Sequence, residues 1–336
     1  MEEQVSIFPE SFQKKNRKKN ILRGKVSGDS FFKSFLGIIT ILIFIIMGLL
    51  ILTLFLNSLL SINTYGFEFL WGTVWDPTPA NPNTPPEFGV LPALLGTLVS
   101  SLIAIIISFP ISIGIALALS EFTSKKINFW VSFLVELLAA IPSVIYGLWG
   151  IFILIPFLRD NIYPAIQYIF GFLPFFQGVD TGYNIFTGGI ILAIMIIPTI
   201  TAISRDIFAA VPNSQREAII ALGATKWEST KIIRKYGRSG VIGGVILGLG
   251  RAIGETMAVT MVIGNSFHLF DSLFDPSYTL ASLIANEFTE ASSPEVYLSA
   301  LIETGLVLLI LALVVNITAR LIIKYTTRKF EGVETF

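Results

Sequence analysis

Long apolar runs without a single charge are the feature that most constrains this chain. No charged residue lies between Lys33 and Glu68 or between Glu87 and Glu121. A helix needs about 20 mostly apolar residues to cross a bilayer. Of the 336 residues, 53% are hydrophobic and 14% are charged, whereas soluble proteins carry about 25% charged residues. The sequence therefore predicts an all-α, polytopic membrane protein.

Six segments fit a membrane-spanning helix, and together they predict a transmembrane domain over 35–325, a basic N-terminal segment over 1–34 and a C-terminal tail over 326–336. The spans are expected at about 35–60, 90–119, 129–158, 186–204, 241–265 and 298–323. Pro142 and Ser143 predict a break or kink in the third span. Glu303 falls in the first turns of the sixth span, where we expect it to reach water on the outer side.

The positions of Lys and Arg predict the orientation. In a six-span chain, 21 of the 23 lie on one side, at 14–33, 125–126, 205–238 and 320–329. Of the other two, Arg159 lies on the opposite side and Arg251 lies inside the fifth span. Because cytoplasmic loops carry the excess of Lys and Arg, we expect both termini in the cytoplasm and a multi-pass protein of the cytoplasmic membrane.

The side opposite to this basic side is acidic. It carries Glu68, Asp76, Glu87, Asp160, Asp180, Asp271, Asp275, Glu287, Glu290 and Glu295. It also holds the Pro-rich stretch DPTPANPNTPPEFG at 76–89, which predicts an extended loop rather than a helix. This loop is either a stiff connector or part of a docking surface for an outer partner.

The loop between the fourth and fifth spans, 206–240, predicts a pair of short cytoplasmic helices joined by a glycine turn. Ser214 and Glu217 have capping-box spacing, and so do Thr225 and Glu228. Gly223 falls where a helix ends in a left-handed residue.

Apolar residues recur on both of these short helices. They are Ala218, Ile219 and Leu222 on the first helix and Trp227, Ile232 and Ile233 on the second. An exposed apolar stripe of this kind suits insertion into a groove of a partner protein. The alternative is a basic loop that lies on anionic headgroups.

Within this loop, EAIIALGATKW at 217–227 resembles the EAA signature of permease subunits of ABC importers. Glu217, Ala218 and Gly223 match the signature. Ile219 replaces its second alanine, and IIRKYG at 232–237 replaces the usual Ile-x-Leu-Pro continuation. The resemblance implies the type I permease fold of ABC importers. It also implies that the loop, with Trp227 beside the motif, docks in a cleft of a cytoplasmic ATPase subunit.

Two further stretches narrow the resemblance. AAIPSVIYGLWG at 139–150 and GGVILGLGRAIGETMAVTMVIGN at 243–265 are similar to the PstC type of permease in phosphate-specific importers. The resemblance implies import of inorganic phosphate, with a homologous second permease subunit, two ATP-binding subunits and an extracytoplasmic phosphate-binding protein as partners. ATP and Mg would be bound by the ATPase partner, and this chain would hold no cofactor.

Arg251 and Glu255 are the charged residues of the fifth span, four residues apart, so on one helix they share a face and can pair. Gly240, Gly244 and Gly248 recur at four-residue spacing, which allows close approach of a neighbouring helix. The pair is either a structural ion pair or part of a polar path.

The chemistry of the two groups favours an anion path. A guanidinium group matches phosphate oxygens two at a time, and a carboxylate nearby keeps the anion from binding too tightly to leave. The resemblance implies that Arg251 and Glu255 lie on the phosphate path. Glu136 in the third span either lines this path, pairs with Arg251 or with a partner subunit, or lies near the membrane surface.

Several classes of function have no support in the sequence. The chain has no Cys and one His, and it lacks a Walker A motif, HExxH and GxSxG, so we expect no ATPase site, no catalytic residue and no metal site. KKNRKK at 14–19 is explained by orientation and headgroup contact, without nucleic acid. The remaining alternatives are an ABC permease for another oxyanion or small solute, and an ion-coupled secondary transporter.

Overall fold

The computed structural model describes residues 27–331 apart from 80, 82, 179–180 and 292–294, and side chains from 31 to 321. The segment 1–34 thus lies mostly outside the described residues, and so does Asp180. The helices are α2 (Ser27–Tyr65), α3 (Glu68–Trp71), α4 (Leu91–Leu117), α5 (Lys125–Ala139), α6 (Ser143–Trp149), α7 (Ile155–Phe157), α8 (Tyr163–Phe170), α9 (Ile185–Ala209), α10 (Asn213–Ala221), α11 (Lys226–Ile253), α12 (Met257–Val262), α13 (Leu280–Glu287) and α14 (Glu295–Glu331).

Short elements extend or join these helices. They are the π-helical turns η1 (Ala118–Phe122), η2 (Gly150–Leu154) and η3 (Leu158–Ile162), the 3-10 turn η4 (Pro174–Phe176), and the strands β1 (Trp75–Asp76) and β2 (Glu87–Phe88). The chain divides into two compact units, Met1–Thr53 and Leu54–Phe336. The described part of the first unit is the beginning of α2, whose side chains from Phe31 to Leu50 are all exposed. Such an apolar surface suits contact with lipid.

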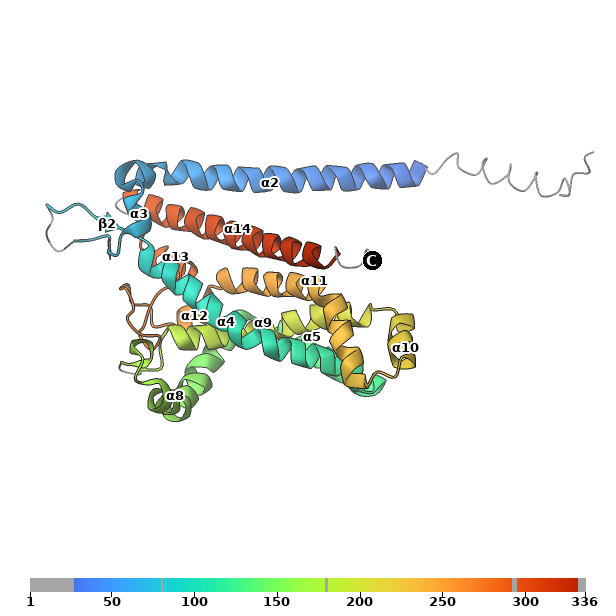
Figure 1. The fold of residues 1–336 in the computed structure, drawn as a ribbon. Helices are drawn as coiled ribbons and strands as arrows, with labels where there is room; N and C mark the ends of the chain where they lie inside the picture. The colour runs from blue at the N-terminus through green and yellow to red at the C-terminus, as the bar shows by residue number, and fades with distance from the viewer. Residues whose placement is uncertain (1–26, 80, 82, 179–180, 292–294, 332–336) are drawn as a thin grey trace, which may run out of the picture. The chain divides into compact units, whose positions relative to one another are not determined.

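Helix α9 is the centre of the second unit, and it packs against α4 on one side and α11 on another (Figure 1). Its side chains at Ile191, Leu192, Ile196 and Ile200 are fully or almost fully buried. The glycine ridge expected on the fifth span faces this helix. A Cβ atom at Gly244 would lie 3.0 Å from Ile203, and at Gly248 it would lie 2.8 Å from Ile200. The prediction of close helix approach is confirmed.

Five helical stretches among the described residues are long and apolar enough to cross a membrane. They are Phe31–Tyr65, Leu91–Phe122, Ser143–Phe170, Ile185–Ala209 and Glu295–Leu321. The first, second, fourth and sixth expected spans each overlap one of these stretches. The count of six spans stays a prediction, because the third and fifth expected spans differ from the structure.

The expected third span, 129–158, is not one helix. Helix α5 ends at Ala139 and α6 begins at Ser143, with Pro142 directly before it. The break predicted at Pro142 is therefore confirmed. The expected end of the span at Leu158 is wrong, because the apolar helical stretch that starts at Ser143 continues to Phe170. Hydropathy alone joined two helices, since both are apolar and no charge separates them.

The expected fifth span, 241–265, is also divided. Helix α11 runs without interruption from Lys226 in the loop 206–240 to Ile253, and α12 follows from Met257. The second short helix of the loop is thus the beginning of the long helix that carries Arg251. The second short helix is therefore not a separate helix, because the helix continues past Val241 although the hydropathy changes there.

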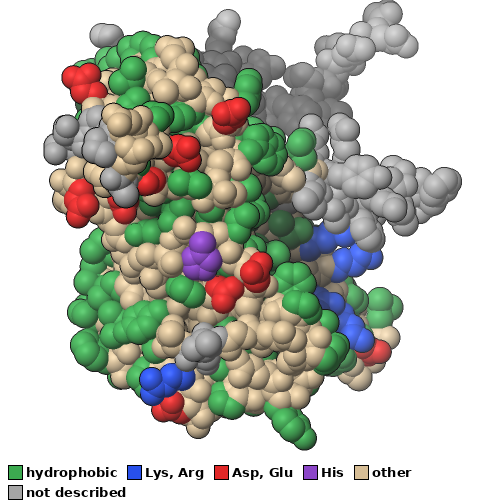
Figure 2. Space-filling model, turned by 90° about the vertical axis from the view of Figure 1, so that its left-hand side faces the viewer, with side chains coloured by type: hydrophobic (Ala, Val, Ile, Leu, Met, Phe, Trp, Pro, Cys, Tyr) green, Lys and Arg blue, Asp and Glu red, His purple; other side chains and the backbone are tan. Residues whose placement is uncertain are grey.

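In its described residues the Pro-rich stretch 76–89 forms a loop, as predicted, and β1 and β2 close the loop at its base. Trp75 pairs with Phe88 in this antiparallel ladder. Phe88 stacks on Tyr297 of α14 with ring centroids 5.5 Å apart. Side chains at Gly72 or Gly89 would collide, because a Cβ at Gly89 would lie 2.3 Å from the Gly72 backbone. Figure 2 shows this end of the molecule, with acidic side chains spread over it and the histidine among them.

We expect Gly189→Ala to destabilise the protein. The new Cβ would lie 2.6 Å from Ile103 Cβ and 3.2 Å from the carbonyl oxygen of Ser100, so α9 and α4 would have to separate. Overpacking of this kind costs about 1–3 kcal/mol. The measurement is the thermal unfolding midpoint of the purified protein in detergent. Gly243→Ala is the control, since no heavy atom lies within 4 Å of its Cβ; equal midpoints for the two variants would contradict the packing.

Candidate functional site

The candidate site lies where helix α11 ends inside the expected fifth span. Arg251 is in the last turn of α11, Gly254 caps the helix, and Glu255 and Thr256 lie between it and α12. Gly250 and Gly254 weaken helix formation here because glycine loses more backbone freedom on folding than other residues. The backbone break thus falls between the two charged residues that were expected to share one helix.

Arg251 and Glu255 each have a different partner from the one predicted. The Nη1 group of Arg251 donates to Oγ1 of Thr199 on α9 at 3.3 Å. The carboxylate of Glu255 accepts a hydrogen bond from the N–H of Ala258 at the start of α12, also at 3.3 Å. Among the described residues no ion pair joins Arg251 to Glu255, so their pairing on one helix is corrected. Both side chains are half-buried.

The helix break is held in place by α6, the helix that follows the other break. A Cβ at Gly147 of α6 would lie 3.2 Å from the Cα of Ala258, so the backbones of α6 and α12 are nearly in contact. Gly254 and Met257 on the other side of the break are exposed. The two interrupted segments therefore pack together and leave one side of the break uncovered in this chain.

Glu136 lies elsewhere. Its carboxylate accepts a hydrogen bond from Arg205 at 3.2 Å, and the same guanidinium group pairs with Asp206 at 2.7 Å. The Glu136 side chain is 60% exposed. Among the described residues Glu136 does not pair with Arg251, which was one of the arrangements considered. Its partner is Arg205, near the end of α9.

Glu303 was expected to reach outer water, and this expectation is wrong. The residue is 6% exposed. It lies on α14 one turn after Ser299, whose hydroxyl donates to the carbonyl of Asn57 at 2.8 Å and accepts from the N–H of Ser61 at 3.0 Å. The segment of α2 after Thr53 covers this face of α14. Hydropathy could not show that cover, because it concerns residues about 240 positions apart.

The loop 206–240 has the helix–turn–helix form that the sequence predicts. Gly223 has a φ of +85°, the left-handed conformation that glycine favours. Thr225 and Glu228 form the predicted capping box, and the Thr225 N–H donates to Glu228 at 2.8 Å. This hydrogen bond lowers the pKa of Glu228. The capping box expected at Ser214 is wrong, because α10 begins at Asn213 after Pro212 and has no side-chain cap.

The residues predicted to couple to an ATPase lie on the surface of this loop. Leu222 is 89% exposed and Trp227 is 62% exposed. Glu217 and Ala218 are exposed on α10. Large apolar side chains this exposed on a loop rich in polar residues are typical of a surface that a partner covers.

Arg216 is a positioning residue that the sequence analysis missed. Its guanidinium group pairs with Glu121 of η1 at 2.9 Å and donates to the carbonyl oxygen of Phe208 at 2.7 Å. These contacts attach α10 to the ends of α4 and α9. The side chains of Arg216 and Glu121 are 19% and 12% exposed. No local pattern indicates the pair, because the two residues are 95 positions apart.

Comparisons with known proteins agree with this architecture. Residues 110–331 match the family model described as "Binding-protein-dependent transport system inner membrane component". The chain belongs to this family of membrane permeases.

Curated relatives define a narrower group. The chain is 44% identical to the phosphate transport system permease protein PstC of Pasteurella multocida over 86% of this chain and 89% of the relative. It is 43% identical to PstC of Haemophilus influenzae over 88% of this chain and 93% of the relative. It is 39% identical to the probable PstC of Methanocaldococcus jannaschii over 82% and 87%.

We expect Arg216→Ala to release α10 from the membrane domain. Loss of charge-assisted hydrogen bonds costs about 1.5–3 kcal/mol, and local opening should increase about tenfold or more. The measurement is the rate of limited proteolysis in the loop 206–240. Gln215→Ala is the matched control, because Gln215 is the neighbouring exposed residue on α10. Equal cleavage rates in the two variants would show that the contacts of Arg216 with Glu121 and Phe208 do not hold α10 in place.

Proposed function

We propose that this chain is the transmembrane permease subunit of an ATP-driven importer that moves inorganic phosphate across the cytoplasmic membrane. The observation that carries the proposal is a half-buried arginine at a helix break, Arg251, in a chain whose curated relatives are phosphate transport permeases. Charged residues within membrane spans commonly mark ion and substrate pathways. In many transporters, interrupted helices within the membrane form the substrate site.

The arrangement suits transient binding of an oxyanion. Arg251 offers a planar set of N–H donors to two phosphate oxygens, and Thr199, already bonded to Arg251, adds a hydroxyl group. Glu255 accepts a hydrogen bond from a protonated phosphate oxygen and repels a fully ionised one. Among the described residues, the helix break separates Glu255 from Arg251, and no ion pair joins the two for phosphate to displace. A site with one cation and a nearby carboxylate binds the anion and still releases it.

Glu136 would line the phosphate path only in the assembled transporter. It lies with Arg205 near the predicted cytoplasmic end of α9. A path-lining role for it would place it after Arg251 on the inward route, where its negative charge favours release of the anion.

The partners follow from the surfaces that this chain leaves uncovered. A homologous second permease subunit would cover the exposed side of the break at Gly254 and Met257. Two ATP-binding subunits, which would bind ATP and Mg, would each dock on one permease subunit. In this chain the docking surface would be the loop 206–240, the coupling loop, with Leu222 and Trp227 in a cleft of the ATP-binding subunit. An extracytoplasmic phosphate-binding protein would deliver phosphate to the acidic end shown in Figure 2. This chain would perform no covalent chemistry of its own.

We expect Arg251→Gln to reduce phosphate uptake by the assembled transporter about 10- to 100-fold, because charge-assisted hydrogen bonds to the anion are lost. Uptake of radioactive phosphate into proteoliposomes, with equal amounts of complex, is the measurement. Arg159→Gln is the control, since Arg159 is exposed and pairs with its neighbour Asp160. Normal uptake by Arg251→Gln would overturn the site assignment. Preferred transport of another oxyanion by the unchanged protein would overturn the substrate.

Leu222→Asp is expected to reduce co-purification of the ATP-binding subunit at least about tenfold, because a charged group would enter an apolar cleft. Leu222→Met keeps the apolar contact and should retain the subunit. If both variants retain it equally, α10 does not dock through Leu222.

The ion-coupled alternative is tested by reconstituting this chain alone under an ion gradient, where we expect no uphill phosphate accumulation.

A further inference from the structure

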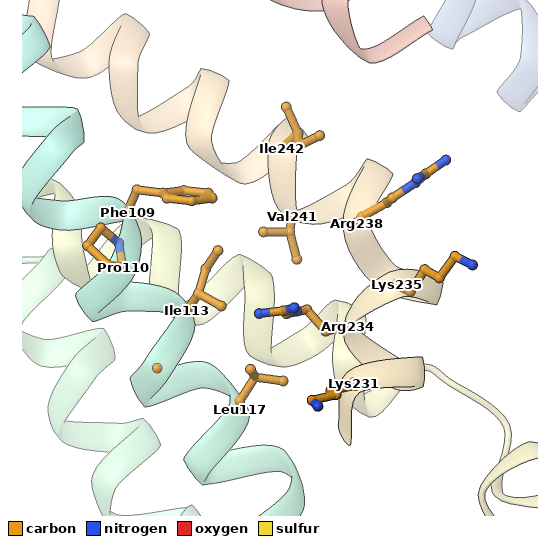
Figure 3. Close-up of a pocket in the computed structure, with 11 residues that line it drawn as sticks. Phe109, Pro110, Ile113, Leu117, Lys231, Arg234, Lys235, Arg238, Val241 and Ile242 are labelled. Carbon is orange, nitrogen blue, oxygen red and sulfur yellow. The ribbon is translucent and has the colours of Figure 1, made fainter. Parts of the chain in front are cut away.

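A cavity of 710 Å³ lies between α4 and the first half of α11, away from Arg251 (Figure 3). Its lining residues are Phe109, Pro110, Ile113, Gly114 and Leu117 from α4, and Lys231, Arg234, Lys235, Arg238, Val241 and Ile242 from α11. The volume falls within the range of about 300–1,000 Å³ that is usual for pockets that bind organic ligands. None of these residues belongs to the candidate phosphate site.

One wall of the cavity is basic. Lys231, Arg234, Lys235 and Arg238 follow the spacing i, i+3, i+4 and i+7, so they lie along one face of α11. Figure 3 shows Lys231 and Arg234 directed toward α4, beside Leu117 and Ile113, and Lys235 and Arg238 directed away from it. In the described part of the chain, this lining includes no Asp or Glu. Two cations therefore converge on the space between the helices.

The other wall is apolar and continues toward the lipid-facing surface. On α4, Leu102 is 58% exposed, Ile106 is 63% exposed and Phe109 is 41% exposed. These residues share a stripe with Ile113, which lies inside the cavity. Gly114 leaves room there, since no heavy atom lies within 4 Å of the position of a Cβ. An acyl chain would follow this stripe from the bilayer to the basic residues.

We propose that this cavity binds an anionic phospholipid, with its phosphate on Arg234 and Lys231 and its acyl chain along Phe109 and Ile106. The distribution of Lys and Arg along the sequence predicts that this end of α11 is cytoplasmic, at the level of the headgroups. Basic pockets between helices on that side bind anionic headgroups. A free phosphate ion fits less well, because it is much smaller than the cavity and gains nothing from the apolar wall.

A lipid in this cavity would lie beside the coupling loop, because Lys231 in the cavity wall is close to Trp227. The Nζ atom of Lys231 lies 5.9 Å from the ring centroid of Trp227, a cation–π distance. Trp227 is one of the exposed residues of the proposed ATPase-docking surface. A lipid held by Lys231 and Arg234 would therefore join α4 to α11 directly beside that surface.

The test measures binding of labelled phosphatidylglycerol and, separately, phosphatidylcholine to the full-length purified chain. We expect preferential retention of phosphatidylglycerol. The double variant Lys231→Gln/Arg234→Gln should weaken its binding roughly tenfold or more. Gly114→Leu should weaken it by filling the cavity without changing charge. Gly243→Leu is the matched control, because Gly243 also has open space at its Cβ but does not line the cavity.

Several outcomes would overturn the proposal. They are equal binding of the two lipids, unchanged binding in the double variant, and displacement of phosphatidylglycerol by millimolar inorganic phosphate, which would assign the basic wall to the free anion. Loss of the bound lipid when the partner subunits are added would assign the cavity to a protein interface. Arg251→Gln should leave lipid binding unchanged, so failure of this proposal is distinguishable from failure of the phosphate site.

Discussion

The contact between α9 and its two neighbours is the interaction on which the rest of the second unit depends. Gly189 lets α4 approach α9, and Gly244 and Gly248 let α11 approach it. Helices in a bilayer gain little from the hydrophobic effect when they associate, because lipid tails are as apolar as their side chains. Close van der Waals packing between glycine and isoleucine replaces the hydrophobic effect. This packing fixes the position of α11 and hence of Arg251.

The helix breaks before α6 and α12 depend on this packing, because it covers the backbone groups that they expose. Backbone N–H and C=O groups that a break releases would be unsatisfied if they faced lipid. Breaks are therefore tolerated where other helices bury them or where they line a polar route. The chain has one break before α6 and one before α12, and these two helices pack against each other. That contact covers one side of the break before α12 and leaves Arg251 and Glu255 half-buried on the other.

Helix α11 connects the two functional regions that we propose. It begins at the capping box of Thr225 beside Trp227 and ends one turn after Gly250, next to Arg251 and Glu255. A continuous helix transmits displacement of one end to the other more directly than a loop would. The Arg216–Glu121 pair attaches α10 to the membrane domain at the same end, and the basic wall of the cavity lies on α11 between the two regions.

The sequence by itself determined the helical class, the approximate first, second, fourth and sixth spans, the glycine ridge and the turn at Gly223. These features depend on hydropathy, spacing and backbone preference, which are properties of neighbouring residues. Only the tertiary structure decided that Glu136 pairs with Arg205, that Arg216 pairs with Glu121, that the part of α2 after Thr53 covers Glu303, and that Arg251 donates to Thr199 instead of pairing with Glu255. The partners in these contacts, 69 and 95 positions apart for the two ion pairs, meet because helices cross in space, and no local pattern records where two helices will cross.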